Sequence, residues 1–322
     1  MSFIPNLRSK PPDAEYVQSK IDVLVSYKDV LDQADAAGGL AELDNPNLYK
    51  IAVVGTGPAG VVTAYELLRI GVAVDIYSTD HSSSRYGRAY SRPFAGNETF
   101  IAEMGAMRFP PSEASLFWYM DKFGIAYDAN FPDPGKVTTL LHLDGQSFTW
   151  EANQPAPPLF ATVTAGLNAL VQDDTILEDG TTLMAPARIT QLMIDGDFRG
   201  SLAAWQPWID NFEDLSFGAG LSRIFQRTTT PPGGERWTDD DMAIFGTIGV
   251  GSGGFGSLYS VQFLEILRLF VNELETDQQF VPSGIASVFD AIANADVGGG
   301  KVLDNHINER VVTVEYSTRT AR

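Results

Sequence analysis

The chain has 322 residues, of which 44% are hydrophobic and 20% are charged, as is ordinary for a folded protein with a sizeable core. Its 41 acidic and 22 basic residues give a net charge of -19. Such a surface repels nucleic-acid phosphates and anionic lipid headgroups, so we expect no nucleic-acid partner and no membrane partner. The length predicts about two domains.

The sequence has no cysteine, which excludes disulfides, cysteine-ligated zinc and thiol chemistry. Its three histidines, His81, His142 and His306, are widely scattered, so we expect neither a metal site nor a histidine-based triad. No signal peptide is recognisable at the N-terminus, and no run of about 18 apolar residues occurs. These features lead us to expect a cytoplasmic protein.

The first part of the chain predicts a helix and then an α/β unit. Residues 13–36 carry apolar side chains at helix-like spacing, and a glycine pair follows them. Residues 50–55 are an apolar run that fits a buried parallel strand, and residues 72–77 are a second such run. Residues 61–70 have a helical pattern closed by a glycine. The order strand, turn, helix, strand predicts a βαβ unit.

The turn inside this unit has the sequence Gly-Thr-Gly-Pro-Ala-Gly. The first glycine permits a tight turn, the second lets the backbone approach a pyrophosphate, and the third lets the helix pack closely on the sheet. Free amides and the helix dipole at this end favour negative charge. Because the motif follows a strand and opens a helix, it predicts a dinucleotide site rather than a structural turn. The residues predicted to bind there are Gly55, Thr56, Gly57, Pro58, Ala59 and Gly60.

The end of the second predicted strand departs from the usual dinucleotide pattern. An acidic residue is expected there to bind the ribose hydroxyls. This sequence has Ser78, followed by Thr79 and Asp80. Either Ser78 binds the ribose or Asp80 reaches back to it, and Asp80 can equally be a solvated loop residue.

Several later segments carry a resemblance to a known family. Residues 86–91, Tyr-Gly-Arg-Ala-Tyr-Ser, resemble the Gly-Gly-Arg segment of the amine oxidase flavoproteins, with Tyr86 in place of the first glycine. Residues 103–110 read Glu-Met-Gly-Ala-Met-Arg-Phe-Pro. The other segments are residues 131–136, 232–237 and 245–255. Together they are similar to the family of FAD-dependent tryptophan 2-monooxygenases and L-amino-acid oxidases, and the similarity runs over residues 51–316.

The resemblance implies an FAD cofactor and assigns roles to residues of this sequence. Arg108 matches the arginine that grips the substrate carboxylate, a role that suits a bidentate guanidinium. The glycine-rich loop with Gly254 and Phe255 is implied to lie beside the substrate cavity. An ordinary turn is the alternative for that loop, and structural ion pairs and an ordinary strand valine are alternatives for Arg108 and Val312. The further residues implied to bind the cofactor are Ser78, Gly87, Arg88, Gly105, Ala106, Met107, Arg108 and Val312.

The fold class expected is α/β, with a Rossmann-like FAD-binding domain interleaved with a mostly helical α+β substrate domain. The expected parts are an N-terminal helical extension at 1–40, the FAD-binding domain at 41–111 and 281–322, and the substrate domain at 112–280. Helices are predicted near 159–171, 189–194, 258–274 and 285–295, and strands near 137–143, 147–150 and 311–316. Aromatic residues such as Trp205, Trp208 and Phe212 are expected near turns. The fold is expected to be incomplete without a C-terminal part, supplied by a second polypeptide.

The activity implied by the resemblance is oxidation of an L-amino acid by hydride transfer from Cα to flavin N5. In the monooxygenases O2 then reacts and the product is an amide, and an aromatic amino acid is the favoured substrate. The alternative is an L-amino-acid oxidase that forms a keto acid, ammonia and hydrogen peroxide. Two further alternatives are an NAD(P)-linked reductase and a non-catalytic FAD-binding fragment that needs a partner chain.

Overall fold

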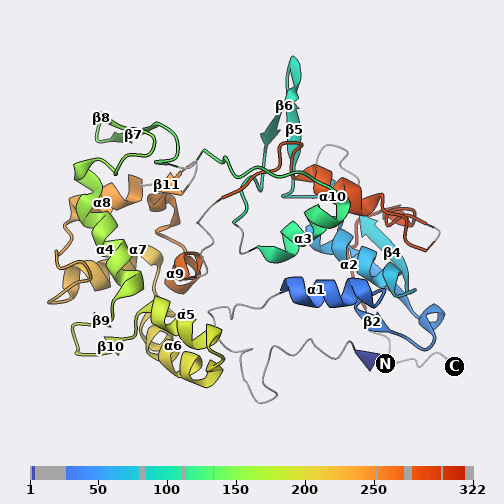
Figure 1. Ribbon diagram of the computed structural model, residues 1–322, viewed down its shortest axis with the longest axis horizontal. Helices are drawn as coiled ribbons and strands as arrows, with labels where there is room; N and C mark the ends of the chain where they lie inside the picture. The colour runs from blue at the N-terminus through green and yellow to red at the C-terminus, as the bar shows by residue number, and fades with distance from the viewer. Residues whose placement is uncertain are drawn as a thin grey trace.

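The computed structural model describes residues 2–3, 27–79, 85–110, 113–132, 134–247, 249–250, 253–271, 278–298 and 300–315. Its elements gather into two lobes that lie side by side (Figure 1). Each lobe surrounds its own cluster of buried apolar side chains. No helix in these ranges is long and apolar enough to cross a membrane.

The first lobe contains both ends of the described chain. Its helices are α1 (Tyr27–Ala36), α2 (Pro58–Arg69), α3 (Ala114–Phe123), α10 (Ala286–Ala293) and the 3-10 turn η2 (Pro46–Leu48). Its strands are β1 (Ser2–Phe3), β2 (Ala41–Glu42), β3 (Lys50–Val54), β4 (Ala73–Ser78), β5 (Ser91–Phe94), β6 (Asn97–Glu103) and β13 (His306–Asn308). The predicted helix over 13–36 lies partly outside the described residues, and its described part is α1.

The second lobe is mostly helical. Its helices are α4 (Ala161–Gln172), α5 (Pro186–Ile194), α6 (Phe198–Phe212), α7 (Phe217–Leu221), α8 (Asp239–Thr247) and α9 (Phe263–Val271). The shorter helical turns are η3 (Pro158–Phe160), η4 (Ser222–Arg227) and η5 (Phe255–Leu258). The strands are β7 (Thr139–Leu143), β8 (Gln146–Trp150), β9 (Thr175–Ile176), β10 (Thr182–Leu183), β11 (Gly249–Val250) and β12 (Gly253–Gly254).

The first lobe contains a parallel sheet in the order β13-β4-β3. The side chains of Val74 and Ile76 on β4 alternate with more exposed neighbours and are buried. Helix α2 connects β3 to β4 and buries Val61 and Ala64 in the same core. This is the βαβ unit predicted from the sequence. It places the carboxyl ends of β3 and β4 at the same edge of the sheet.

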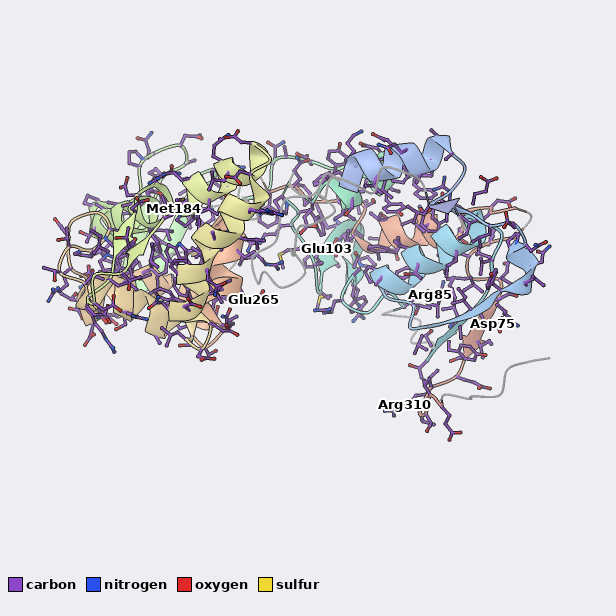
Figure 2. All side chains as sticks on the ribbon, turned by 90° about the horizontal axis from the view of Figure 1, so that it is seen from below. Asp75, Arg85, Glu103, Met184, Glu265 and Arg310 are labelled. Carbon is purple, nitrogen blue, oxygen red and sulfur yellow. The ribbon has the colours of Figure 1, made fainter. Side chains whose placement is uncertain are left out.

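The strand predicted at residues 311–316 is wrong. The third strand of the sheet is β13, which pairs with β4 so that His306 faces Ile76. Residues 309–315 form no strand, and the side chains of Val312 and Val314 are 83% and 85% exposed. Arg310 projects away from the lobe in Figure 2. The alternating pattern predicted a strand, but hydrogen-bond pairing with β4 ends at Asn308.

Helix α3 packs in the first lobe although it falls within residues 112–280, the range expected for the substrate domain. Trp118 Nε1 donates a hydrogen bond to Asp32 Oδ1 on α1 (2.9 Å), and Tyr119 OH donates one to Glu66 Oε1 on α2 (2.8 Å). Glu66 also pairs with Arg69 (3.0 Å). The buried carboxylate of Glu66 therefore has partners on both oxygens, as a buried charge requires.

Aromatic rings fill the core of the second lobe. Trp205, Trp208 and Phe212 recur at one-face spacing on α6 and are buried, so the expectation that they lie near turns is wrong. Phe263 of α9 stacks on Phe212 with ring centroids 4.6 Å apart. Helix α6 also contains Pro207 in its interior. The stripe of large rings stabilises the helix by burial.

Candidate cofactor and substrate site

The glycine turn between β3 and α2 has a backbone that other residues fit poorly. Gly55 has a φ of +98°, a conformation that favours glycine, and its amide donates to the Tyr77 carbonyl at 2.7 Å. A Cβ on Gly60 would lie 2.0 Å from the Gly55 carbonyl oxygen. The turn is thus tied to the end of β4 and packed against its own helix.

The N-terminus of α2 suits a diphosphate. Gly57 is the N-cap residue, so no side chain caps this end of the helix, and Pro58 follows it. The amides of the first helical turn have no acceptor within a helix, and the dipole adds positive charge there. Gly57 is half-buried and Ala59 is exposed, so this end of the helix is open. The residues present therefore fit the phosphates of a dinucleotide.

The loop that contains Gly87 and Arg88 lies beside this turn. Thr56 Oγ1 donates to the Arg85 carbonyl at 2.6 Å, and a Cβ on Gly57 would come within 3.9 Å of the Tyr86 carbonyl. Tyr86 is buried and its hydroxyl donates to Asp290 Oδ1 on α10 at 2.6 Å. The tyrosine therefore anchors the loop to α10, and Gly87 and Arg88 are exposed beside the turn.

The segment with Gly105 and Ala106 is held against the same loop. The amide of Ala106 donates to the Arg88 carbonyl at 2.9 Å, and that of Met104 donates to the Tyr90 carbonyl at 2.8 Å. A Cβ on Gly105 would lie 1.9 Å from the Arg88 carbonyl oxygen, so only glycine permits this approach. Three segments predicted separately from the sequence are thus brought together.

Ser78 lies at the edge of the sheet next to the glycine turn. Its Oγ is 3.2 Å from Thr56 Oγ1 and 2.7 Å from His306 Nε2. No motif around His306 indicates a role in this site, because only the parallel pairing of β13 with β4 brings it here. Asp80, the other candidate for the ribose, lies outside the described residues.

Arg108 follows these cofactor segments and is half-buried. Its neighbour Phe109 exchanges both backbone hydrogen bonds with Gln279, at 2.8 and 2.9 Å. This pairing holds the backbone next to Arg108 in place. A cavity of about 230 Å³ adjoins the segment, and its lining residues are Ile101, Glu103, Met107, Phe131, Pro132, Phe280, Val281 and Pro282.

Glu103 connects the cavity wall to helix α10 and lies on the side of the first lobe that faces the second (Figure 2). Its Oε2 accepts a hydrogen bond from Ser91 Oγ (2.7 Å), and its Oε1 accepts one from the Ile285 amide (2.6 Å). The Ser91 hydroxyl in turn accepts from the Ala286 amide at 3.0 Å. Burial raises the pKa of Glu103 above its ordinary value of 4.5, although these hydrogen bonds oppose the shift.

The raised pKa of Glu103 predicts a pH-dependent contribution to stability. The folded state binds the proton more tightly than the unfolded state, so the contribution is fully present below pH 4.5 and is lost as the pH rises through the raised pKa. Urea unfolding of wild type and Glu103→Gln over a pH series is expected to show wild type losing stability relative to the variant as the pH rises. Parallel curves would contradict this, and Glu98→Gln on exposed β6 is the control.

Gly254 and Phe255 are not brought together with the cofactor segments. Phe255 is buried in the second-lobe core, where its ring stacks on Phe245 with centroids 4.9 Å apart and contacts Phe270 at 5.3 Å. A Cβ on Gly254 would lie 1.9 Å from the Gly246 carbonyl oxygen, so this glycine allows close backbone packing. Stacking and burial favour a packing role for Phe255 over the wall of an open pocket. Among the described residues, no group of acidic and histidine side chains is arranged to hold a metal.

Comparison with known proteins gives the class of this chain. Residues 58–322 match the family model described as flavin containing amine oxidoreductase, so the chain belongs to this family. Tryptophan 2-monooxygenase from Pseudomonas savastanoi is 38% identical over 294 residues, which are 90% of this chain and 52% of that enzyme. The enzyme of the same name from Agrobacterium tumefaciens (strain Ach5) is 38% identical over 92% of this chain and 39% of its own length. The solved structure of cyclohexylamine oxidase from Brevibacterium oxydans is 15% identical, with a TM-score of 0.48 over 80% of this chain and 50% of that one.

Family membership confirms the resemblance to this family, the α/β flavoprotein fold and FAD as the cofactor. The chain spans about half the length of the first of these relatives and less of the second. Both relatives carry their additional length in a single chain, so the predicted second polypeptide is not supported.

Proposed function

We propose that this protein acts in the FAD-dependent oxidation of an L-amino acid, most like tryptophan 2-monooxygenase. The overall reaction would convert an aromatic L-amino acid and O2 into the corresponding amide, carbon dioxide and water. The proposal rests on one observation: the glycine turn, the Arg88 loop and the Gly105 segment lie in contact with one another. Arg108 follows the Gly105 segment directly in the chain, and the cavity adjoins it.

In this proposal the first lobe holds the cofactor. The first-turn amides of α2 bind the diphosphate, and Gly55, Gly57 and Gly60 allow the close approach. Gly87 and Arg88 lie along the same edge, where the guanidinium adds charge-assisted hydrogen bonds. The predicted division into an FAD-binding domain at 41–111 and 281–322 and a substrate domain at 112–280 belongs to this proposal, with α3 joined to the first.

Arg108 would bind the carboxylate of the amino acid. A guanidinium and a carboxylate pair through two parallel hydrogen bonds, which fix orientation as well as position. The backbone pairing of Phe109 with Gln279 holds the segment, so little conformational entropy would be lost when the substrate binds. The flavin, when bound, would supply the two-electron oxidation of the Cα–N bond of the amino acid.

Product analysis with L-tryptophan tests this function. The monooxygenase predicts indole-3-acetamide as the product, with consumption of O2. An L-amino-acid oxidase would instead give indole-3-pyruvate, ammonia and hydrogen peroxide. A protein that binds FAD and forms neither set of products with a panel of L-amino acids would contradict the proposal and favour a non-catalytic binding role.

A further inference from the structure

We propose that Ser78 and His306 together form the subsite for the ribose of the adenosine half of the dinucleotide, in place of the acidic residue usual at this position. The inference rests on the proposed function, because it requires FAD. Its basis is the approach of Ser78 Oγ to His306 Nε2 at 2.7 Å, between residues 228 positions apart in the chain.

The two side chains lie where a dinucleotide ribose is bound in this fold. Ser78 is the last residue of β4, and His306 is the first residue of β13, the parallel neighbour of β4. The glycine turn is tied to the same edge, because the Gly55 amide donates to the Tyr77 carbonyl at 2.7 Å. Ligands of open parallel sheets bind outside the carboxyl ends of the strands, next to the phosphate-binding turn.

The number of hydroxyl and imidazole protons decides whether Ser78 and His306 can accept hydrogen bonds from a ligand. Thr56 has one hydroxyl proton and donates it to the Arg85 carbonyl at 2.6 Å. The Thr56 hydroxyl is also within donating distance of Ser78 Oγ, at 3.2 Å; when its proton is directed to Arg85, only the Ser78 hydroxyl can donate across this contact. With the Ser78 proton directed to Thr56, the 2.7 Å contact is a donation from His306 Nε2–H to Ser78 Oγ.

In that arrangement the pair has free acceptor capacity for ribose. The serine oxygen has two lone pairs, and the second can accept a hydroxyl proton from the ribose. The imidazole Nδ1 of His306 is then an acceptor as well. The two neighbouring hydroxyls of a ribose can therefore donate to Ser78 Oγ and His306 Nδ1, as they would donate to the two oxygens of a carboxylate.

The carboxylates on the same strands are engaged elsewhere. Asp75 on β4 pairs with Lys50 on β3 at 2.8 Å. Asp304, just before β13, accepts from the Lys301 amide at 2.7 Å. Neither lies at the end of β4, the place that the ribose-binding acid usually occupies.

The test compares FAD with its 2′-deoxy and 3′-deoxy adenosine analogues. Dissociation constants are measured by flavin fluorescence for wild type, Ser78→Ala and His306→Ala. Wild type is expected to bind FAD about tenfold more tightly than either deoxy analogue, which corresponds to the loss of one or two hydrogen bonds. Each variant is expected to bind FAD up to about tenfold more weakly than wild type does and to lose most of its preference for FAD over the analogues. His142→Ala is the matched control, because His142 also contacts a serine, Ser147 at 2.9 Å, but in the second lobe.

The outcomes separate this inference from the proposed function. If wild type binds FAD but both variants keep the full preference over the deoxy analogues, the ribose assignment is overturned alone. The same holds if Asp80→Asn removes the preference and the two variants do not. Wild type that fails to bind FAD would overturn the proposed function and this inference with it. Should His306→Ala not fold, Ser78→Ala, which removes one hydroxyl, decides.

Discussion

Gly60→Ala is expected to weaken FAD binding roughly 10- to 100-fold, the effect of forcing a methyl group into a closely packed site. In most helices alanine is about 1 kcal/mol better than glycine. Here the new Cβ would lie 2.0 Å from the Gly55 carbonyl oxygen, which belongs to the backbone and cannot rotate away. The turn must therefore move, and the first-turn amides of α2 move with it.

Isothermal titration of the apoprotein with FAD measures this effect. Thr63→Ala is the matched control, since Thr63 is exposed on the same helix one turn later and its replacement also adds helix propensity. The control is expected to bind FAD as wild type does. An unchanged FAD affinity in Gly60→Ala, with the fold intact by circular dichroism, would show that the turn does not hold the cofactor.

Arg108→Ala is expected to lower kcat/KM for the amino acid by about 100-fold or more, as loss of one partner of a desolvated charge pair does. Arg108→Lys keeps the charge but loses the planar fork, so an intermediate loss is expected. Because the role is substrate binding, most of the loss is expected in KM. The flavin content of the purified variants is measured in parallel, so that loss of cofactor is recognised.

Arg92→Ala is the matched control for Arg108, because Arg92 is an exposed arginine on the neighbouring strand β5. It is expected to leave both kinetic constants unchanged. If Arg108→Ala retains its flavin and its KM for the amino acid equals that of wild type, Arg108 does not bind the carboxylate. The structural alternative, an ion pair within the fold, would then be favoured.

The parts of the site that the sequence predicts are local. The roles of Gly55 and Gly60 follow from a motif six residues long, and the strand and helix around it follow from apolar periodicity over neighbouring residues. The structure has the same strand, turn and helix there, from β3 to β4. Backbone sterics within one turn and one helix are set by adjacent residues, so the motif and the geometry agree.

The parts that the sequence does not predict depend on distant pairing. His306 contacts Ser78 only because β13 pairs with β4 in one register, and nothing near His306 in the sequence specifies that register. The alternation at residues 311–316 predicted the strand a few positions too late. An alternating pattern describes a surface that fits a sheet, but the pairing partner decides which residues join it.

The second lobe shows how side-chain packing overrides local signals. Proline disfavours a helix interior, yet α6 continues through Pro207, and Asn211 Nδ2 donates to the Pro207 carbonyl at 2.8 Å. The buried rings of Trp205 and Trp208 supply the burial that holds the helix. Phe255 likewise lies in this core by contacts with rings distant in sequence, which its glycine-rich surroundings could not indicate.

The central claim is that the turn from Gly55 to Gly60 holds the diphosphate of a flavin dinucleotide. Equilibrium titration of the apoprotein with FAD, FMN and riboflavin under the same conditions tests it most directly. We predict that FAD binds at least about 100-fold more tightly than FMN, because only FAD carries the diphosphate and adenosine that this edge of the sheet is built to bind. Equal affinities for FAD and FMN, or no binding of either, would contradict the claim.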